Sequence, residues 1–189
     1  MTLTPATPPG SAPAGTLIAT IGPPGAGKTT WRRQFLATTP ATVVSLDELR
    51  ARFSPCGCSA DHSVNQVATA HGLRITHQAL QTGGTVVWDT TAASYPARAS
   101  MLACAAAHHA RTIAVVILPP LIHALRRNAR RDNRTCRTCA RARRVPDHRI
   151  WAMHTHITAA LPALHREGWH EIHLHDLPPY IRQPNQHAA

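Results

Sequence analysis

The residues best suited to chemistry in this chain lie in one short stretch, GPPGAGKTT, which runs from Gly22 to Thr30. Gly22, Gly27, Lys28 and Thr29 fit the phosphate-binding pattern G-x-x-x-x-G-K-[ST]. Glycines let successive backbone N–H groups turn toward a phosphate, and the N-terminus of a following helix directs its own N–H groups to the same place. The stretch therefore predicts a nucleotide-binding loop.

Two side chains of this loop have definite expected roles. Lys28 should contact the β- and γ-phosphates of ATP, and the Thr29 hydroxyl should bind Mg²⁺. Lys28 is the only lysine among 20 basic residues, which indicates that a compact point charge is needed there. The simpler alternative is a Gly-Pro turn that binds nothing. We expect the nucleotide to contact the whole loop, Gly22, Pro23, Pro24, Gly25, Ala26, Gly27, Lys28, Thr29 and Thr30.

A phosphate loop of this kind needs a strand before it and a helix after it. The apolar run at 16–21 supplies the strand, and residues 28–37 predict the helix. Further strands are expected at 42–45, 85–88, 111–118 and 171–174, and further helices at 47–52, 63–82, 96–109, 121–131 and 148–161. Strands that alternate with helices predict an α/β fold of three layers, with a parallel sheet covered on both faces.

Length and composition indicate one domain, because 189 residues support a single core of ordinary size. Residues 1–15 are rich in Pro, Thr and Ala and predict a disordered leader, so the domain is expected over 16–176 and a flexible tail over 177–189. No apolar run approaches the roughly 20 residues of a membrane span, and the N-terminus lacks a secretory signal. We therefore expect a cytoplasmic protein without a membrane partner.

The charge of the chain is concentrated in one segment. The net charge is +11 with histidine neutral, and nine arginines lie between Arg126 and Arg144 with Asp132 as the only acid. We call residues 126–145 the arginine segment. Such a density of arginine is typical of contact with phosphate, whether of a nucleotide, a nucleic acid or both. The alternative is a solvated surface in an arginine-biased composition.

Acids are scarce, and two of them follow predicted strands. Ligands bind at the carboxyl ends of the strands in an open α/β sheet, so Asp47, Asp89 and the phosphate loop should share one cleft. Asp89 is expected to hold Mg²⁺ through water and to lie against the substrate. Asp47 is expected to cap its helix and also to act as the base for an acceptor hydroxyl, with Arg50 on the same helix face to orient the acceptor. A plain N-cap and a surface arginine are the alternatives.

Two arginines four residues apart could neutralise a transferring phosphoryl group from one helix face. Arg127 with Arg131 is one such pair, and Arg126 with Arg130 is the other. The sequence leaves this choice open.

Five motifs resemble, in order and spacing, the kinase domain of phage-type and bacterial polynucleotide 5′-hydroxyl kinases. They are GPPGAGKTTW at 22–31, SLDELR at 45–50, VVWDTT at 86–91, RNARR at 127–131 and RVPDHRIWAM at 144–153. The resemblance covers 16–174 and implies a P-loop kinase with an arginine-rich lid, which transfers the γ-phosphate of ATP to the 5′-OH of RNA or DNA. It implies ATP and Mg²⁺ binding by Lys28 and Thr29, a general base at Asp47, an acceptor-phosphate site at Arg50, and a clamp on ATP from Arg127 and Arg131.

One motif departs from the family pattern, because Asp89-Thr90-Thr91 lacks the asparagine that usually ends it. The S-x-D-x-x-R motif also occurs in related kinases that act on antibiotics, sugars, nucleosides or aminoacyl-tRNA. A small-molecule kinase is therefore an alternative, and so is a non-catalytic protein that binds a partner or nucleic acid in response to nucleotide. The basic charge favours a nucleic-acid acceptor.

Five cysteines complete the set of reactive side chains. Cys104 lies in an alanine-rich predicted helix, where a small buried residue is expected. Cys56 and Cys58 form a C-x-C pair, and Cys136 and Cys139 form a C-x-x-C pair. If both pairs overhang the same cleft, four thiolates could bind Zn²⁺ and pin the arginine segment to the loop after the Asp47 helix. Reduced surface thiols and a redox-active pair are the alternatives.

Overall fold

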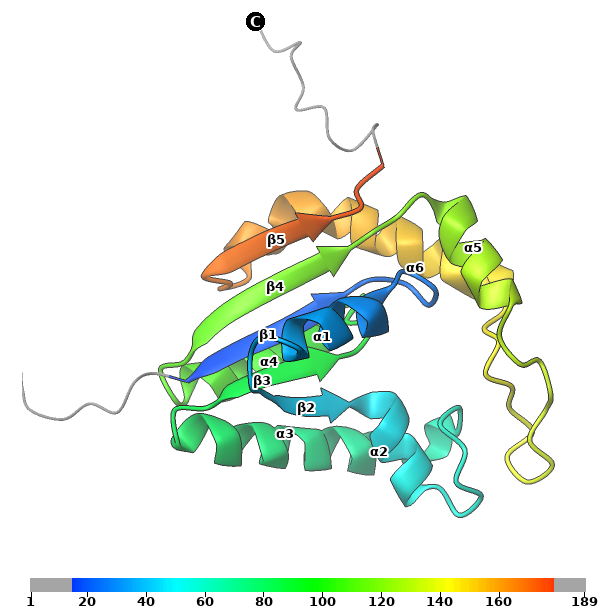
Figure 1. Ribbon diagram of the computed structural model, residues 1–189, viewed down its shortest axis with the longest axis horizontal. Helices are drawn as coiled ribbons and strands as arrows, with labels where there is room; N and C mark the ends of the chain where they lie inside the picture. Colours follow the sequence, from blue (N-terminus) through cyan, green and yellow to red (C-terminus); the bar gives the residue numbers. More distant parts are fainter. Residues whose placement is uncertain (1–14, 179–189) are drawn as a thin grey trace, which may run out of the picture.

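Five parallel strands form a single sheet in the order β2-β3-β1-β4-β5 in this computed structural model, which describes residues 15–178. All neighbouring strands pair in parallel, and their arrows point the same way in Figure 1. The strands are β1 Thr16–Ile21, β2 Thr42–Ser45, β3 Thr85–Asp89, β4 Arg111–Ile117 and β5 Glu171–His175. The expected parallel α/β sheet is confirmed. The expected leader and tail fall mostly on residues 1–14 and 179–189, outside the described range.

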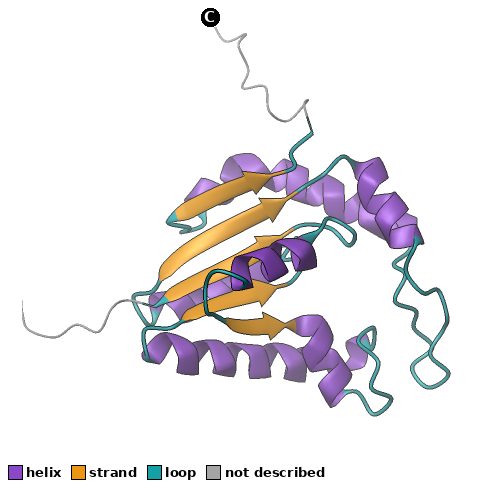
Figure 2. Cartoon of the chain, viewed as in Figure 1, coloured by secondary structure: helices purple, strands orange, loops and turns teal. Residues whose placement is uncertain are grey.

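Helices connect the strands and lie on both faces of the sheet (Figure 2). The α-helices are α1 Lys28–Leu36, α2 Leu46–Phe53, α3 Asn65–Gln81, α4 Tyr95–Ala106, α5 Leu121–Ala129 and α6 Asp147–Ala160. Two 3₁₀ turns, η1 His62–Val64 and η2 Leu161–Arg166, precede α3 and follow α6. In residues 15–178, no helix has the length and apolar character that crossing a membrane requires.

The side chains of β1 alternate between two cores, as the period of a strand requires. Leu17 and Ile21 belong to the larger core, which α3, α4 and α6 cover. Ile18 belongs to the smaller core on the opposite face, where α1 contributes Trp31 and Phe35. The sheet is thus buried on both faces at its centre, which explains why its strands read as continuous apolar runs.

Trp88 fixes the end of β3 against α3. Its indole N–H donates to the buried Thr76 hydroxyl at 2.7 Å. Gly72 lets the helix approach this closely, because a Cβ there would lie 2.9 Å from the Trp88 ring. On the other side, the buried Thr20 hydroxyl of β1 donates to the Trp88 carbonyl at 3.1 Å. Asp89, the next residue, therefore starts from a rigid backbone.

The structure corrects the expected start of α2. Ser45, not Asp47, is the N-cap, since its hydroxyl accepts a hydrogen bond from the Glu48 N–H at 3.4 Å and its backbone is extended. A cap must lie outside the helical turn and three residues before its donor, and Ser45 meets both conditions. The Asp47 carboxylate is consequently free for other contacts.

Three further expectations are corrected. The helix expected from Ser63 begins at Asn65, because Asp61 caps the separate turn η1. The helix expected to reach Arg131 ends at Ala129, where no further apolar residue packs against the core. Cys104 is half-buried rather than buried, although this burial still raises its pKa.

Candidate active site

The phosphate loop between β1 and α1 has a conformation that its glycines permit. Gly25 and Gly27 have φ of 82° and 111°, in the left-handed region that favours glycine. A Cβ on Gly22 would lie 2.4 Å from the Ile117 carbonyl oxygen, and one on Gly25 would lie 2.3 Å from that of Ala124. The loop is therefore wedged between β4 and α5, and its shape is set by the surrounding fold.

Lys28, the first residue of α1, extends over this loop. Its ammonium donates to the carbonyl oxygens of Gly22 at 2.9 Å and Pro23 at 3.0 Å. The charge that is expected to meet a β- or γ-phosphate is thus held against the backbone that would surround it.

The pKa of Lys28 shows which charges surround it. Burial lowers the pKa from 10.5 to about 8, while the nearby Asp89 carboxylate raises it, Arg131 lowers it and Asp47 raises it. Asp89, Arg131 and Asp47, which the sequence predicted to converge on the phosphate loop, therefore all lie within electrostatic reach of Lys28. Lys28 lies on α1 and Asp89 at the end of β3, while Arg131 follows α5 and Asp47 lies on α2.

Thr29 and Asp89 provide two oxygen atoms side by side. The Thr29 hydroxyl donates to Asp89 Oδ2 at 3.3 Å, across the junction of α1 and β3. A hydroxyl and a carboxylate at the mouth of a phosphate loop fit the oxygen ligands and bound waters that Mg²⁺ prefers. The roles of the two residues stay predictions.

Sequence reasoning missed Arg32. It lies four residues after Lys28 on α1, and its guanidinium contacts Asp89 at 3.2 Å and Glu48 at 3.1 Å. The side chain is only 14% exposed, and its buried Nε has no hydrogen-bond partner among the described residues. The i+4 spacing from Lys28 was the available signal. Arg32 thus links α1 and the end of β3 to Glu48, in the same turn of α2 that carries Asp47.

Asp47 and Arg50 form an ion pair on the exposed side of α2. Arg50 is also fixed by two acceptors, the Ser59 carbonyl at 2.8 Å and the Asn65 side chain at 3.0 Å. A guanidinium has five N–H donors, so two remain for an anionic ligand. The Asp47 carboxylate, at 68% side-chain exposure, stays open to a substrate.

The arginine segment begins directly beside the phosphate loop. Arg127 donates to the Ala26 carbonyl at 3.0 Å and lies within 3.5 Å of that of Gly25. Arg131 lies beyond the end of α5, but its charge is close enough to lower the pKa of Lys28. These contacts favour Arg127 and Arg131 over the pair Arg126 and Arg130, and the clamp on ATP stays a prediction.

Most of the charge in the arginine segment faces solvent. Eight of its nine arginines are exposed, and Arg144 is half-buried. Within residues 15–178, the one ion pair made by this segment joins Arg144 to Asp147 at 4.0 Å. The positive charge is therefore not neutralised by neighbouring acids.

The two cysteine pairs meet beside this segment. One sulfur from each of Cys56, Cys58, Cys136 and Cys139 lies within 4.8 Å of the others, and all four residues are half-buried, free thiols. Hydrogen bonds from the backbone N–H groups of Cys139 and Thr138 lower the pKa of Cys136 to about 7, whereas burial raises that of Cys139. Four sulfurs in this arrangement could hold a tetrahedral metal ion such as zinc.

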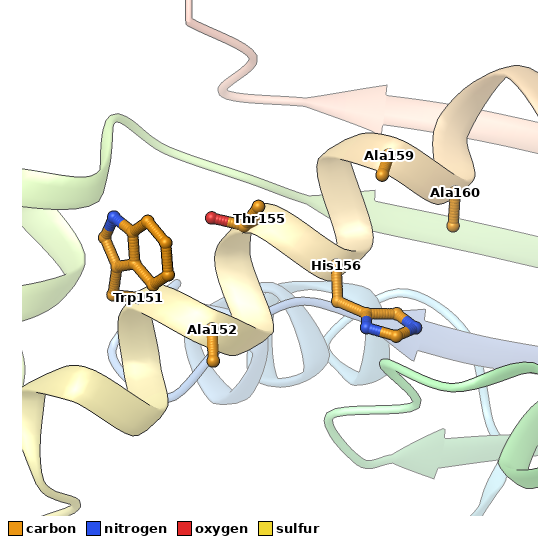
Figure 3. A pocket seen from close by; sticks show the side chains of 6 residues that line it. All are labelled: Trp151, Ala152, Thr155, His156, Ala159 and Ala160. Carbon is orange, nitrogen blue, oxygen red and sulfur yellow. The ribbon is translucent and has the colours of Figure 1, made fainter.

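A hollow of about 470 Å³ runs along α6, lined by Trp151, Ala152, Thr155, His156, Ala159 and Ala160 (Figure 3). Trp151 at one end of the hollow is 58% exposed. None of these residues belongs to the constellation around Lys28. The candidate site is therefore the group of residues around the phosphate loop, to which this hollow contributes none.

A family model described as an AAA domain matches residues 17–160. The match spans more than half of the chain, and the chain belongs to this family, with a P-loop kinase domain. A search of curated proteins finds no match.

Solved structures with the same fold include two of an RNA repair assembly. A chain of the Pnkp1/Rnl/Hen1 RNA repair complex matches with a TM-score of 0.64 at 19% identity, over 84% of this chain and 49% of that one. A chain of a second Pnkp1/Rnl/Hen1 structure matches with a TM-score of 0.53 at 20% identity, over 74% and 47%. Chaetomium thermophilum Kti12 bound to ADP-AlF3 matches with 0.51 at 15%, over 84% and 87%. The chain thus spans about half the length of the first two, and these likenesses concern the fold.

Proposed function

We propose that this protein is an ATP-dependent kinase that phosphorylates a hydroxyl group, with the 5′-OH of an RNA or DNA end as its acceptor. One observation carries the proposal: Asp47, paired with Arg50, lies within electrostatic reach of Lys28 on the phosphate loop. A carboxylate and an arginine opposite a phosphate-binding loop are the groups that transfer to an acceptor requires. ATP hydrolysis alone needs no acceptor-binding arginine.

On the donor side, Lys28 and the N–H groups of the phosphate loop would hold the β- and γ-phosphates. Thr29 directly, and Asp89 through water, would hold Mg²⁺, which offsets the charge of the phosphate oxygens when it is bound. Arg32 keeps the Asp89 carboxylate in place, since it contacts Oδ2 at 3.2 Å. Arg127 and Arg131 would stabilise the charge that develops on the transferring group.

On the acceptor side, the Asp47 carboxylate would take the proton of the hydroxyl. The hydroxyl oxygen then bonds to the γ-phosphorus, while the bond from that phosphorus to the β–γ bridging oxygen breaks and ADP leaves with its electron pair. Arg50, with two N–H donors to spare, would hold a phosphate of the acceptor. Its other donors are occupied, so its orientation is set before the acceptor arrives.

The acceptor class follows from charge. Among residues 15–178, the exposed arginines of the arginine segment form no ion pair, and such a surface suits a polyanion better than a small neutral alcohol. The fold shared with a chain of an RNA repair complex supports the same direction, at the level of analogy.

The test is transfer of labelled γ-phosphate from ATP, with Mg²⁺, to single-stranded RNA and DNA oligonucleotides ending in 5′-OH. Oligonucleotides that already carry a 5′-phosphate are the matched negative substrates. We expect label on the 5′-OH ends only, and a loss of about 10²-fold or more in Asp47→Asn. The control is Glu171→Gln. Glu171 is the first residue of β5, which lies at the edge of the sheet opposite to β2 and Asp47, so this substitution should leave transfer unchanged.

Each other outcome selects a different function. Transfer to small hydroxylated compounds but not to oligonucleotides would assign a small-molecule kinase. Nucleotide binding without transfer to any acceptor would indicate a nucleotide-switched binding protein. The dependence of affinity on salt separates a polynucleotide kinase from a small-molecule kinase. The logarithm of oligonucleotide affinity should fall with the logarithm of salt concentration with a slope of about −0.7 for each phosphate contacted, and a small-molecule kinase should show no such dependence.

A further inference from the structure

Two cysteine pairs separated by about 80 residues of chain meet at one point. Cys56 and Cys58 lie in the loop after α2, and Cys136 and Cys139 lie in the arginine segment. Each offers one sulfur, and these sulfurs lie within 4.8 Å of one another. Four thiolates bonded to Zn²⁺ at about 2.3 Å would have sulfurs about 3.8 Å apart, so only a small contraction is needed. We propose that this chain binds one structural Zn²⁺ through these four thiolates, and that the ion fastens the arginine segment to the loop after α2.

The C-x-C half of this site is built by its own hydrogen bonds. The Ser54 hydroxyl donates to Asp61 Oδ2 at 2.7 Å and lies 3.0 Å from the Cys56 sulfur, which closes the loop. Gly57 has a φ of 67° with no atom within 4 Å of a Cβ position, so the turn between the two cysteines needs glycine for its backbone alone. Arg50 also holds the Ser59 carbonyl. These two sulfurs are therefore positioned without help from the arginine segment.

The C-x-x-C half is a short hairpin. The Cys136 N–H donates to the Arg141 carbonyl at 2.8 Å, and the Ala140 N–H donates to the Cys136 carbonyl at 2.9 Å. Ala140 has a φ of 52°, a conformation that is costly for a residue with a side chain. The turn directs the Cys136 and Cys139 sulfurs to the same cluster. The backbone hydrogen bonds that close the turn fix the positions of these two thiols before a metal ion binds.

The surroundings suit the charge of such a site. A Zn²⁺ with four thiolates has a net charge of −2, and the hairpin that carries two of them also carries Arg137 and Arg141. The pKa of His62, in the turn that follows the C-x-C loop, is lowered mainly by burial and by Arg50. Arg141 also lies close enough to His62 to lower this pKa. Arg141 of the hairpin and His62 thus lie near each other where the two halves of the site meet.

The proposed ion would give the arginine segment a second anchor. The segment already contacts the phosphate loop through Arg127, and Figure 1 shows it running from α5 and α6 toward the loop after α2. A metal at the cysteines would hold it across the cleft from the donor side to the acceptor side. Metal binding itself does not depend on the proposed kinase activity, and its tests need no substrate.

The first test is metal content. Full-length protein, reduced and reloaded with Zn²⁺, should retain about one zinc per monomer after gel filtration, measured by elemental analysis and by native mass spectrometry. Co²⁺ in its place should give the absorption of a tetrahedral four-thiolate site. Less than about a tenth of a zinc per chain, retention of iron in place of zinc, or zinc found only in a dimer would each overturn the proposal.

The second test asks whether both halves bind the same ion. The double variants Cys56→Ser/Cys58→Ser and Cys136→Ser/Cys139→Ser should each lose the zinc, and Cys104→Ser should keep it because Cys104 lies outside the cluster. Zinc retained by either double variant would show that the ion does not bridge the two segments.

The third test measures the position of the arginine segment through limited digestion with trypsin, which cuts after arginine. Removal of zinc should speed cleavage after Arg137 and Arg141 by about tenfold or more, because the hairpin then opens more often. Cleavage after Arg74, on α3, serves as the internal control. Equal rates with and without zinc at both hairpin sites would contradict a fastening role.

Discussion

Asn128 holds the backbone of Val145 from both directions: its amide nitrogen donates to the Val145 carbonyl at 2.8 Å, and its amide oxygen accepts from the Val145 N–H at 3.1 Å. Asn128 is fully buried at the end of α5, and Val145 directly precedes the Pro146 that starts α6. The two ends of the arginine segment are thereby joined. The segment is a closed loop on a rigid base, with Arg127 and Arg131 beside the joint.

Replacing Asn128 by alanine should therefore loosen this joint. Two part-buried backbone groups of Val145 would lose their partners, and we expect the free energy of unfolding to fall by about 1–3 kcal/mol. Denaturant unfolding and tryptic cleavage of the arginine segment measure the two effects. Asn133→Ala is the matched control because Asn133 is exposed within the same segment. An equal response of both variants would argue against the joint.

The pKa of Lys28, about 8, predicts a pH dependence of ATP binding. Above pH 8 the free protein increasingly holds a neutral amine, whereas bound phosphates favour the ammonium, so binding must take up a proton there. ATP affinity should change little from pH 7 to 8 and then fall, approaching about tenfold per pH unit. Calorimetry in buffers of different ionisation enthalpy counts the proton. Lys28→Arg should bind ATP without that uptake, since arginine stays charged.

The lowered pKa of Lys28 also affects folding stability, which it raises with increasing pH where ATP affinity falls. Between pH 8 and the unfolded value of 10.5, the unfolded chain binds more protons at Lys28 than the native state does. This residue alone therefore makes the protein more stable as the pH rises through that window. Below pH 8 both states are protonated, and the cost of burying the ammonium is complete.

Arg127 should act mainly on the rate of transfer. Its guanidinium already lies against the Ala26 carbonyl, so ATP would meet it without a large movement of the chain. Arg127→Ala should lower kcat by on the order of 10³-fold, by the behaviour of arginines that stabilise phosphoryl transfer, with a smaller change in ATP affinity. Steady-state kinetics and equilibrium nucleotide binding separate these terms, with Arg74→Ala on α3 as control. A pure loss of affinity at unchanged kcat would assign Arg127 to ground-state binding only.

Arg98 and Glu167 form a buried ion pair whose loss should strongly lower the free energy of unfolding. Their side chains are 3% and 9% exposed, and two hydrogen bonds of 2.7 and 2.5 Å join them. Arg98 also donates to the carbonyls of Ala92 and Ala93, just after the end of β3. Arg98→Ala should cost about 3–5 kcal/mol, because it leaves the Glu167 carboxylate without its counter-charge and two carbonyls without their donor.

A second arginine allows this prediction to be calibrated. Arg111 pairs with Glu171, but its side chain is 58% exposed, so Arg111→Ala should cost less than about 1 kcal/mol. Unfolding by denaturant compares both variants directly. Similar losses from the two substitutions would mean that burial does not set the strength of the Arg98 pair.

The sequence predicted the elements well, because local patterns encode them. Apolar runs of about four to eight residues became β1 to β5, each within about one residue of its expected ends. The helix ends were less accurate where two residues compete for one role, as Ser45 and Asp47 compete for the cap of α2. The rule that strand ends gather ligands correctly brought Asp47 and Asp89 to the phosphate loop.

The sequence by itself thus determined the α/β class, the phosphate loop and the residue types available to it, because these depend on spacings of a few residues. The tertiary structure decided which distant side chains meet. Arg32 joins Asp89 to Glu48, Asn128 closes the arginine segment, and four cysteines from two segments converge. Contacts of this kind depend on how elements far apart in the chain pack around a common sheet, and no local pattern of polarity or turn residues specifies them.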